Sequence, residues 1–347
     1  MSQLNGIDLR NYYYNKLTSQ EQFSYNQVVG AVVSRRSECA LNGGSVERNQ
    51  EIGKAVVLEN PEMVRYPGIF QGISTNGSIF LYYGDVDENR FNRKLDQLVN
   101  SIDEKLTATA SDYEVCKAIF DALGENLEYA YDVLEKYGQM ERDNAPMAEK
   151  MQFMNSKSAA FTAYGAIVEN KAICSGIAKA FRILCGKFNI PCACVEAESK
   201  GARRIPHMLN AVEIDGKTLF VDLTNGLKDK NLKALRYDYF LATRQIIEKD
   251  FAISSRFDIP CDEEGENYFV HNKKKFKTIY DMRRYLAAYT CSSTNKVIRL
   301  QYEGEMCDDK LRDAFSEIVN NHCEDGKAME FCVVRNGFCT GIIKDLD

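Results

Sequence analysis

Cys174 is the residue in this sequence whose type and position best suit a nucleophile. The segment after it carries apolar residues at helical spacing, which predicts a helix that begins at or next to Cys174 and ends before Pro191. At a helix N-terminus the backbone N–H groups lack partners and the helix dipole favours negative charge, so a thiol there becomes a better thiolate nucleophile. Gly176 would let another segment of the chain approach closely.

His207 and Asp222 are the two residues that could activate this thiol, and both lie in a predicted β-hairpin. Residues 207–214 and 217–224 alternate as strands around Asp215-Gly216, a strong signal for a two-residue turn. His207 and Asp222 then project from the same face as diagonal neighbours, roughly 7–8 Å apart at the backbone. The full register pairs Ile214 with Lys217, Val212 with Leu219, Leu209 with Asp222 and His207 with Thr224.

A thiol, an imidazole and a carboxylate in these places match the nucleophile, base and orienter of covalent catalysis. Asp222 would fix the tautomer of the imidazole and favour its protonated form. His207 would pair with the Cys174 thiolate and then protonate the leaving amine. The alternative is three unrelated structural residues, since a free cysteine is commonly a small buried hydrophobe. The order of the three residues and the hairpin geometry together favour catalysis.

The elements that precede this constellation are predicted to be mainly helical. Helices are expected over residues 19–33, 45–58 and 89–106, and a hairpin over residues 68–83. Ser111 with Glu114 forms a capping-box pattern that predicts another helix start. The stretch around residue 107 indicates a domain boundary. Residues 137–157 are charged and Met-rich, which indicates a partly mobile connection.

Beyond residue 255 a separate α/β pattern follows. It predicts a strand over residues 268–276, a helix over 279–289, a strand over 297–302 and a helix over 308–321. Asn336-Gly337 predicts a tight hairpin turn near the end of the chain. The predicted domains are therefore a mainly helical N-terminal domain with a hairpin (1–107), a core (108–255) and a small α+β C-terminal domain (256–347).

The core resembles a known family. Its order of Cys, then His opening a strand, then Asp in the next strand is similar to that of the transglutaminase-like superfamily, which shares the papain-like fold. Residues 162–181 resemble the bacterial members' stretch around the nucleophile, and Asn189-Ile-Pro-Cys resembles their Gly-Ile-Pro strand start. The resemblance covers roughly residues 112–250, and the flanking regions resemble Gram-positive bacterial relatives more loosely. It implies an α+β fold with a papain-like core and an antiparallel sheet.

The sequence departs from the family around the predicted site. The usual His-x-Trp-Asn is His207-Met-Leu209-Asn210 here, and the chain has no Trp. Leu209, across from Asp222 in the predicted register, can exclude water from the Asp–His bond but supplies no aromatic wall and no indole N–H. The family's Asp-x-Thr-Trp ending is Asp222-Leu-Thr-Asn225. These changes leave the three chemical groups in place.

The oxyanion of an acyl-transfer reaction needs hydrogen-bond donors, and the backbone N–H of Cys174 is the natural first one. Tyr164 is a weak candidate for the second from its place in the motif, against its interpretation as a packed aromatic. No metal is expected, because Cys192-Ala-Cys194 lies in a strand-like segment with no second Cys/His pair at ligand spacing. No cofactor is expected either.

Composition narrows the classes of partner. The formal net charge is -6, without a long basic stripe, which argues against nucleic-acid binding. No apolar stretch is long enough to span a membrane, and no signal peptide is visible at the N-terminus. Twelve cysteines without an export signal indicate free thiols in a reducing, cytoplasmic compartment.

The sequence thus predicts thiol-dependent acyl transfer on peptide or side-chain amides, with a protein or peptide as substrate. Cys174, His207 and Asp222 would form the catalytic triad of a cysteine peptidase, an amidase or a transglutaminase. Hydrolysis is favoured because water needs no second binding site. The alternatives are a non-catalytic binding module of the same fold, favoured by the missing Trp, and a transferase that moves an acyl group between small molecules.

Overall fold

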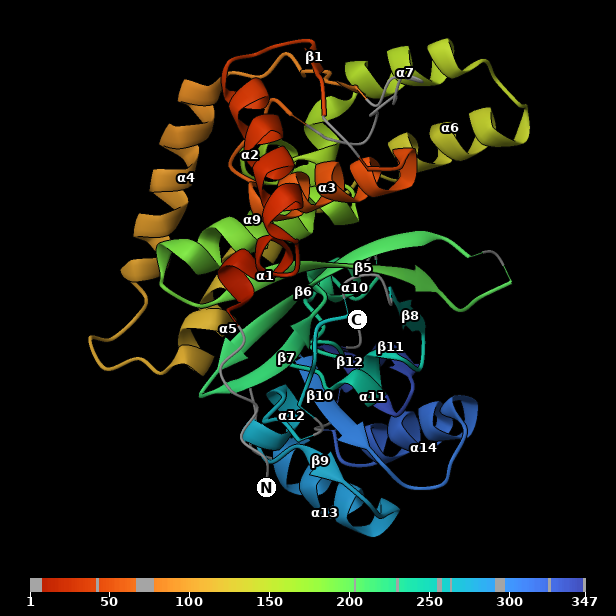
Figure 1. Cartoon of the computed structure of the whole chain (residues 1–347). Coiled ribbons are helices and arrows are strands. Elements are labelled where there is room, and N and C mark those ends of the chain that lie inside the picture. The colour runs from red at the N-terminus through yellow and green to blue at the C-terminus, as the bar shows by residue number, and fades with distance from the viewer. Residues whose placement is uncertain are drawn as a thin grey trace.

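A computed structural model describes residues 8–41, 44–66, 78–202, 204–228, 231–254, 258–262, 264–290, 297–323 and 326–345. It combines helices with mainly antiparallel sheets, which confirms the predicted α+β class. The N-terminal helices, the helix that begins at Cys174 and a protruding helical pair lie on one side of a central sheet. The C-terminal strands and helices lie on the other side (Figure 1). Within the described residues, no helix has the length and apolar character needed to cross a bilayer.

The predicted N-terminal helices are confirmed. They start where side chains cap them: Thr18 and Glu21 form a capping box, and Ser45 and Asp87 cap the next two helices. Of the hairpin predicted over residues 68–83, residues 68–77 lie outside the described residues. The elements are η1 (Leu9–Asn11), α1 (Tyr12–Asn15), α2 (Ser19–Val33), β1 (Glu38–Cys39), α3 (Val46–Glu59), β2 (Ile79–Phe80) and α4 (Glu88–Asp103); β1 pairs with β2.

The N-terminal helices share their hydrophobic core with the rest of the molecule. One cluster joins buried residues of α4, such as Phe91 and Ile102, to buried residues further along the chain. Polar contacts reinforce this packing, because the buried guanidinium of Arg182 donates to the carbonyl oxygens of Leu58 and Arg10. Because Arg182 lies in the segment that follows Cys174, these two hydrogen bonds connect the N-terminal helices to that segment.

Where the sequence indicates a partly mobile connection over residues 137–157, the structure has the end of one helix and a second helix. Apolar side chains recur at helical spacing there and pack in a cluster that includes Val133, Met154 and Ile173, with the charged residues on the solvent side. The capping box at Ser111 is confirmed. The elements are α5 (Asp112–Gly124), β3 (Glu128–Tyr129), α6 (Tyr131–Arg142), α7 (Met147–Ser156), η2 (Ser158–Phe161), α8 (Ala163–Val168), β4 (Lys171–Ala172) and α9 (Cys174–Lys187).

The central sheet has the strand order β7-β6-β5-β8 and is antiparallel. Asp215 and Gly216 both have positive φ, as a tight hairpin turn requires, and the predicted pairs Ile214–Lys217 and Val212–Leu219 are present. The second strand is shorter than predicted, because Asp222 leaves the sheet and caps a short helix. The elements are β5 (Cys192–Ser199), β6 (Pro206–Ile214), β7 (Lys217–Val221), α10 (Leu223–Gly226), α11 (Arg244–Ile247) and β8 (Phe251–Ile253).

The C-terminal module, residues 264–345, has a hydrophobic cluster of its own around Phe315 and Leu300. The predicted strand over residues 268–276 is present only at Lys275–Phe276, because Asn267 accepts from two backbone N–H groups and starts a helix. The other predicted elements are confirmed. They are α12 (Tyr268–His271), β9 (Lys275–Phe276), α13 (Ile279–Thr290), β10 (Val297–Tyr302), α14 (Asp308–Asn320), β11 (Lys327–Arg335) and β12 (Phe338–Asp345), with the strand order β11-β12-β10-β9.

Candidate active site

Cys174 is the first residue of α9, as predicted, and its side chain is buried. The N-cap residue, Ile173, offers no polar side chain to the first turn, so the N–H groups of that turn keep their positive potential for other acceptors. The backbone N–H of Ile173 donates to the carbonyl oxygen of Ala160 at 3.0 Å, which fixes the point where α9 begins. The sulfur is therefore seated on the positive end of a well-anchored helix.

The close approach predicted at Gly176 is made by η2. A Cβ atom at this position would lie 2.6 Å from the carbonyl oxygen of Ala160 and 2.7 Å from that of Thr162. The next carbonyl oxygen, that of Phe161, accepts from the buried ammonium of Lys179 at 3.1 Å. Burial lowers the pKa of Lys179 to about 8, although the neighbouring thiols of Cys194 and Cys174 oppose that shift. The turn and the helix are thus held together next to Cys174.

His207 and Asp222 meet as predicted, with Nε2 of the imidazole 2.8 Å from Oδ2 of the carboxylate. The carboxylate is only 1% exposed. It also accepts from the side-chain amide of Asn225 at 2.7 Å and from the backbone N–H of Asn225 at 3.2 Å. The backbone N–H of Asp222 donates to the carbonyl oxygen of Tyr239 at 3.0 Å. Three hydrogen bonds to the carboxylate and one from the backbone of the same residue therefore hold Asp222 in place.

The imidazole of His207 also has the side chain of Cys174 as a hydrogen-bond partner. Because Nε2 serves Asp222, Nδ1 is the ring nitrogen left for the thiol. The structure thus brings together the three residues predicted for catalysis. A thiol on one side and a carboxylate on the other are the partners that an imidazole needs to accept and return a proton.

Electrostatics favour the charged form of the His207 imidazole. Burial alone would lower the pKa of His207, but the charge and hydrogen bond of Asp222, together with Cys174, raise it to about 10. Burial would likewise raise the pKa of Asp222, but the imidazolium of His207 and the hydrogen bonds from Asn225 hold it below its usual value. At neutral pH the imidazole of His207 is therefore charged, and both Asp222 and Cys174 favour this charged form.

Tyr129 is a site residue that the sequence analysis did not assign. Its hydroxyl interacts with both the side chain and the backbone of Cys174, and burial together with the neighbouring Cys174 side chain raises the pKa of Tyr129. The residue comes from β3, which pairs in parallel with β4 directly before α9. Its only signal in the sequence is its position ahead of the nucleophile segment, which does not reveal the pairing of β3 with β4.

Although the chain has no Trp, an aromatic ring does lie against the imidazole of His207, and it is that of Phe251. Its ring stacks on the imidazole of His207, with centroids 4.6 Å apart and an interplanar angle of 16°. In the sheet, Ala197 of β5 pairs with His207 and Ser199 pairs with Phe251. Ala197 and Ser199 lie on one face of β5, and their small side chains let the two rings meet above the strand. No local pattern in the sequence announces this cross-strand contact.

The two weaker candidates lie in hydrophobic packing. Leu209 is 1% exposed and shares a cluster with Phe251, so it helps to keep water from the imidazole side of the site. Its predicted pairing with Asp222 is replaced by the turn into α10, since the β6–β7 ladder ends at Asn210 and Val221. Tyr164 is buried in the core with its ring stacked on Phe91, and its described contacts lie there.

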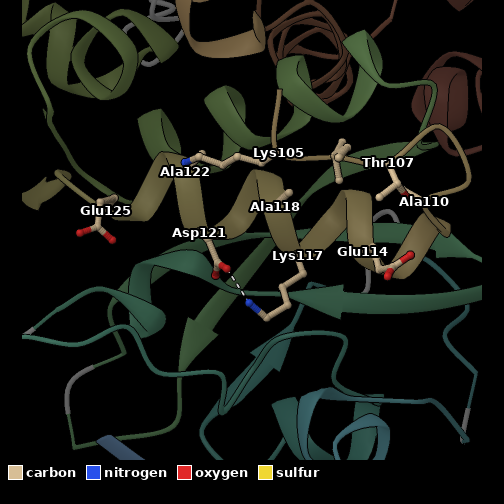
Figure 2. A pocket seen from close by; sticks show the side chains of 10 residues that line it. Lys105, Thr107, Ala110, Glu114, Lys117, Ala118, Asp121, Ala122 and Glu125 are labelled. Carbon is tan, nitrogen blue, oxygen red and sulfur yellow. Dashed lines mark hydrogen bonds and ion pairs between the residues drawn. The ribbon is translucent and has the colours of Figure 1, made fainter. Parts of the chain in front are cut away.

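A surface hollow of about 410 Å³ lies away from the triad, between the end of α4 and one face of α5. Figure 2 shows Lys117 paired with Asp121 across its lining. No cysteine or histidine lines it, so it supplies neither a thiol nor an imidazole. Within the part of the chain that the structure describes, no group of three or more His, Cys, Asp or Glu side chains is arranged to hold a metal ion.

No protein-family model and no curated protein matches this sequence. The structure is similar to three solved structures. A crystal structure of a TGase matches at 16% identity and a TM-score of 0.32, over 42% of this chain and 35% of that one. A "Putative Cysteine Protease from Cytophaga hutchinsonii" matches at 17% identity and a TM-score of 0.26, over 44% and 46%. A "putative protease from Parabacteroides distasonis" matches at 9% identity and a TM-score of 0.26, over 80% and 57%. The chain spans less than half of the length of the first two.

Proposed function

We propose that this protein is a thiol-dependent enzyme of the transglutaminase-like type that acts on peptide or side-chain amides. The observation that carries the proposal is the contact between His207 and Asp222 at 2.8 Å, with Cys174 at the other side of the imidazole. The three groups come from distant segments, on α9, on β6 and after β7. Their convergence in a buried place gives each group the partner that its role requires.

The reaction starts with attack of the Cys174 sulfur on the amide carbonyl carbon. A carbon–sulfur bond forms, and the carbonyl π electrons move to the oxygen, whose negative charge the positive end of the α9 dipole would stabilise. The oxyanion then collapses, the carbon–nitrogen bond breaks, and the leaving amine takes a proton from the imidazolium of His207. The products of this half-reaction are a thioester on Cys174 and a free amine.

The second half-reaction resolves the thioester. The neutral imidazole of His207 accepts a proton from water as the water oxygen attacks the carbonyl carbon, and the carbon–sulfur bond breaks. The product is a carboxylic acid, and the thiolate–imidazolium pair is restored. An amine in place of water would give a new amide by the same steps. We assign hydrolysis to this protein, because water needs no second binding site.

Product analysis on a peptide library tests the proposal and separates the two acceptors. The library contains peptides with internal Gln and Asn, and it is incubated with the protein with and without a biotinylated primary amine. Hydrolysis gives cleaved or deamidated peptides in both samples, whereas transamidation gives biotinylated peptides only with the amine. Cys174→Ala is expected to abolish every product. Cys307→Ala, which removes an exposed thiol outside the site, is the matched control and keeps full activity. Products that persist in Cys174→Ala would exclude the proposed reaction.

A further inference from the structure

Arg335 of the C-terminal module reaches the triad through one residue. It is the last residue of β11 and precedes the turn Asn336-Gly337, where both residues have positive φ. The carboxylate of Asp308 accepts from the backbone N–H groups of Asn336 and Gly337 at 2.7 and 3.1 Å, which ties the hairpin tip to the start of α14. The module therefore fixes the backbone from which Arg335 extends toward the core.

The guanidinium of Arg335 makes three contacts with the core. It donates to the side-chain oxygen of Asn225 at 3.1 Å, pairs with the carboxylate of Asp250 at 3.2 Å and lies over the ring of Tyr239, 5.5 Å from its centroid. The hydroxyl of Tyr239 also donates to Asp250. A planar cation with an anionic partner and an aromatic face has little freedom left, so its direction toward Asn225 is fixed.

The contact with Asn225 decides which way its amide points. A guanidinium has donors only, so the oxygen of the amide must face Arg335 and the nitrogen must face away from it. In that orientation the amide nitrogen donates to Oδ2 of Asp222 at 2.7 Å, the same oxygen that holds Nε2 of His207. A flipped amide would place its oxygen against the carboxylate, which is repulsive, and would leave Arg335 facing an N–H group.

We propose that Arg335 is a positioning residue of the active site, and that the C-terminal module thereby completes the triad of the core. The inference rests on the proposed function for its catalytic meaning, but the hydrogen bonds that carry it are independent of substrate. Arg335 orients Asn225, Asn225 holds the carboxylate of Asp222, and Asp222 holds the imidazole. The C-terminal module thereby holds the carboxylate of Asp222 in the position that the reaction needs.

Arg299 provides a matched control within the same module. It donates to the backbone oxygen of Leu235 at 2.9 Å and lies over the ring of Tyr237, 5.2 Å from its centroid. Both arginines thus stack on a core tyrosine and hydrogen-bond to the core, but the described contacts of Arg299 do not lead to Asp222. Its replacement removes a comparable contact between module and core without touching the amide of Asn225.

The test is an NMR titration of the His207 imidazole in the full chain, with Arg335→Ala, Arg335→Lys and Arg299→Ala. The chain has three histidines, so the signal of His207 is identified by its loss in His207→Gln. Arg335→Ala is expected to move the pKa of His207 by about one unit and to slow Cys174 alkylation about tenfold, as for a lost hydrogen bond to a charged network. Arg335→Lys keeps a donor, so its His207 pKa should lie between those of wild type and Arg335→Ala. If the alanine variant does not fold, the comparison of Arg335→Lys with wild type carries the test.

The inference is overturned if the His207 titration is the same in wild type and both Arg335 variants. It is also overturned if Arg299→Ala moves the titration as far as Arg335→Ala does, since any loss of module contact would then suffice. Adding guanidinium ion at millimolar concentration should restore the wild-type titration of His207 in Arg335→Ala and in no other variant. If the titration responds as expected but Cys174 of the wild type shows no enhanced reactivity, the proposed function fails while the positioning role of Arg335 stands.

Discussion

The imidazole of His207 lies flat against the ring of Phe251, with the two centroids 4.6 Å apart. Phe251 is buried, and its ring covers a face of the imidazole that would otherwise meet water. A low-dielectric surrounding strengthens the hydrogen bond between His207 and Asp222. An aromatic residue from β8 thus gives this site the flat ring that Leu209 does not provide.

Phe251→Leu keeps an apolar side chain but removes the flat ring. Turnover is expected to fall about tenfold, because the imidazole loses a stacking partner and water reaches the bond to Asp222. The measurement is the rate of amide hydrolysis together with the free energy of unfolding from urea titration. Phe251→Tyr, which retains the ring, should keep more activity than Phe251→Leu. Equal activity of the two variants would show that the stacked ring plays no part in the reaction.

The raised pKa of His207 predicts the alkaline limit of activity. His207 must be protonated to serve the leaving amine, and its pKa is about 10, so turnover is expected to fall as the pH rises through about 10. In Asp222→Asn, which lacks the carboxylate charge, the alkaline limb should move toward lower pH. The pH dependence of kcat/KM in both proteins gives the comparison. An alkaline limb that is unchanged in Asp222→Asn would contradict the electrostatic role of this carboxylate.

The same shift links stability to pH. The pKa of His207 is higher in the folded protein than the unfolded value of about 6.5, so this stabilisation is complete below about pH 6.5 and is lost as the pH rises toward 10. Urea unfolding of wild type and Asp222→Asn at pH 6, 8 and 10 isolates this contribution, because other groups titrate in both. The stability difference is expected to narrow over that range. A difference that stays constant would mean that the imidazole is not charged in the folded protein.

Gly176→Ala is expected to destabilise the protein, because the added Cβ would lie 2.6 Å from the carbonyl oxygen of Ala160. The turn and the helix start would have to separate, at a cost of about 1–3 kcal/mol. Gly186→Ala is the matched control in the same helix, where a Cβ meets no atom within 4 Å and helix propensity should add up to about 1 kcal/mol of stability. Thermal unfolding of both variants gives the answer, and a Gly176→Ala protein as stable as Gly186→Ala would contradict the tight crossing.

The local parts of this site could be predicted from the sequence. Apolar spacing after Cys174 indicates the helix, and Asp215-Gly216 sets the hairpin register that brings His207 toward Asp222. The end of β7 at Val221 was missed because the capping hydrogen bonds of Asp222 compete with strand pairing, and that competition leaves no trace in the alternation of the residues.

The remaining parts of the site come from contacts between distant segments. Phe251 reaches His207 through the pairing of β8 with β5, and Arg335 reaches Asn225 from a hairpin 110 residues further along the chain. Neither pairing has a local pattern that specifies the partner. The sequence does not predict α6 and α7, because their many charged residues obscure the apolar positions at helical spacing. In the structure these apolar residues pack around Ile173.

The rate of Cys174 alkylation by iodoacetamide tests the central claim most directly. The rate is measured at pH 6 by mass spectrometry of the labelled peptides, with the exposed thiol of Cys307 as internal reference. If Cys174 and His207 form an ion pair, Cys174 reacts at least tenfold faster than Cys307 at this pH, and His207→Ala removes the difference. If Cys174 reacts no faster than Cys307, or keeps its rate without the imidazole, the sulfur is not an activated nucleophile and the catalytic assignment is wrong.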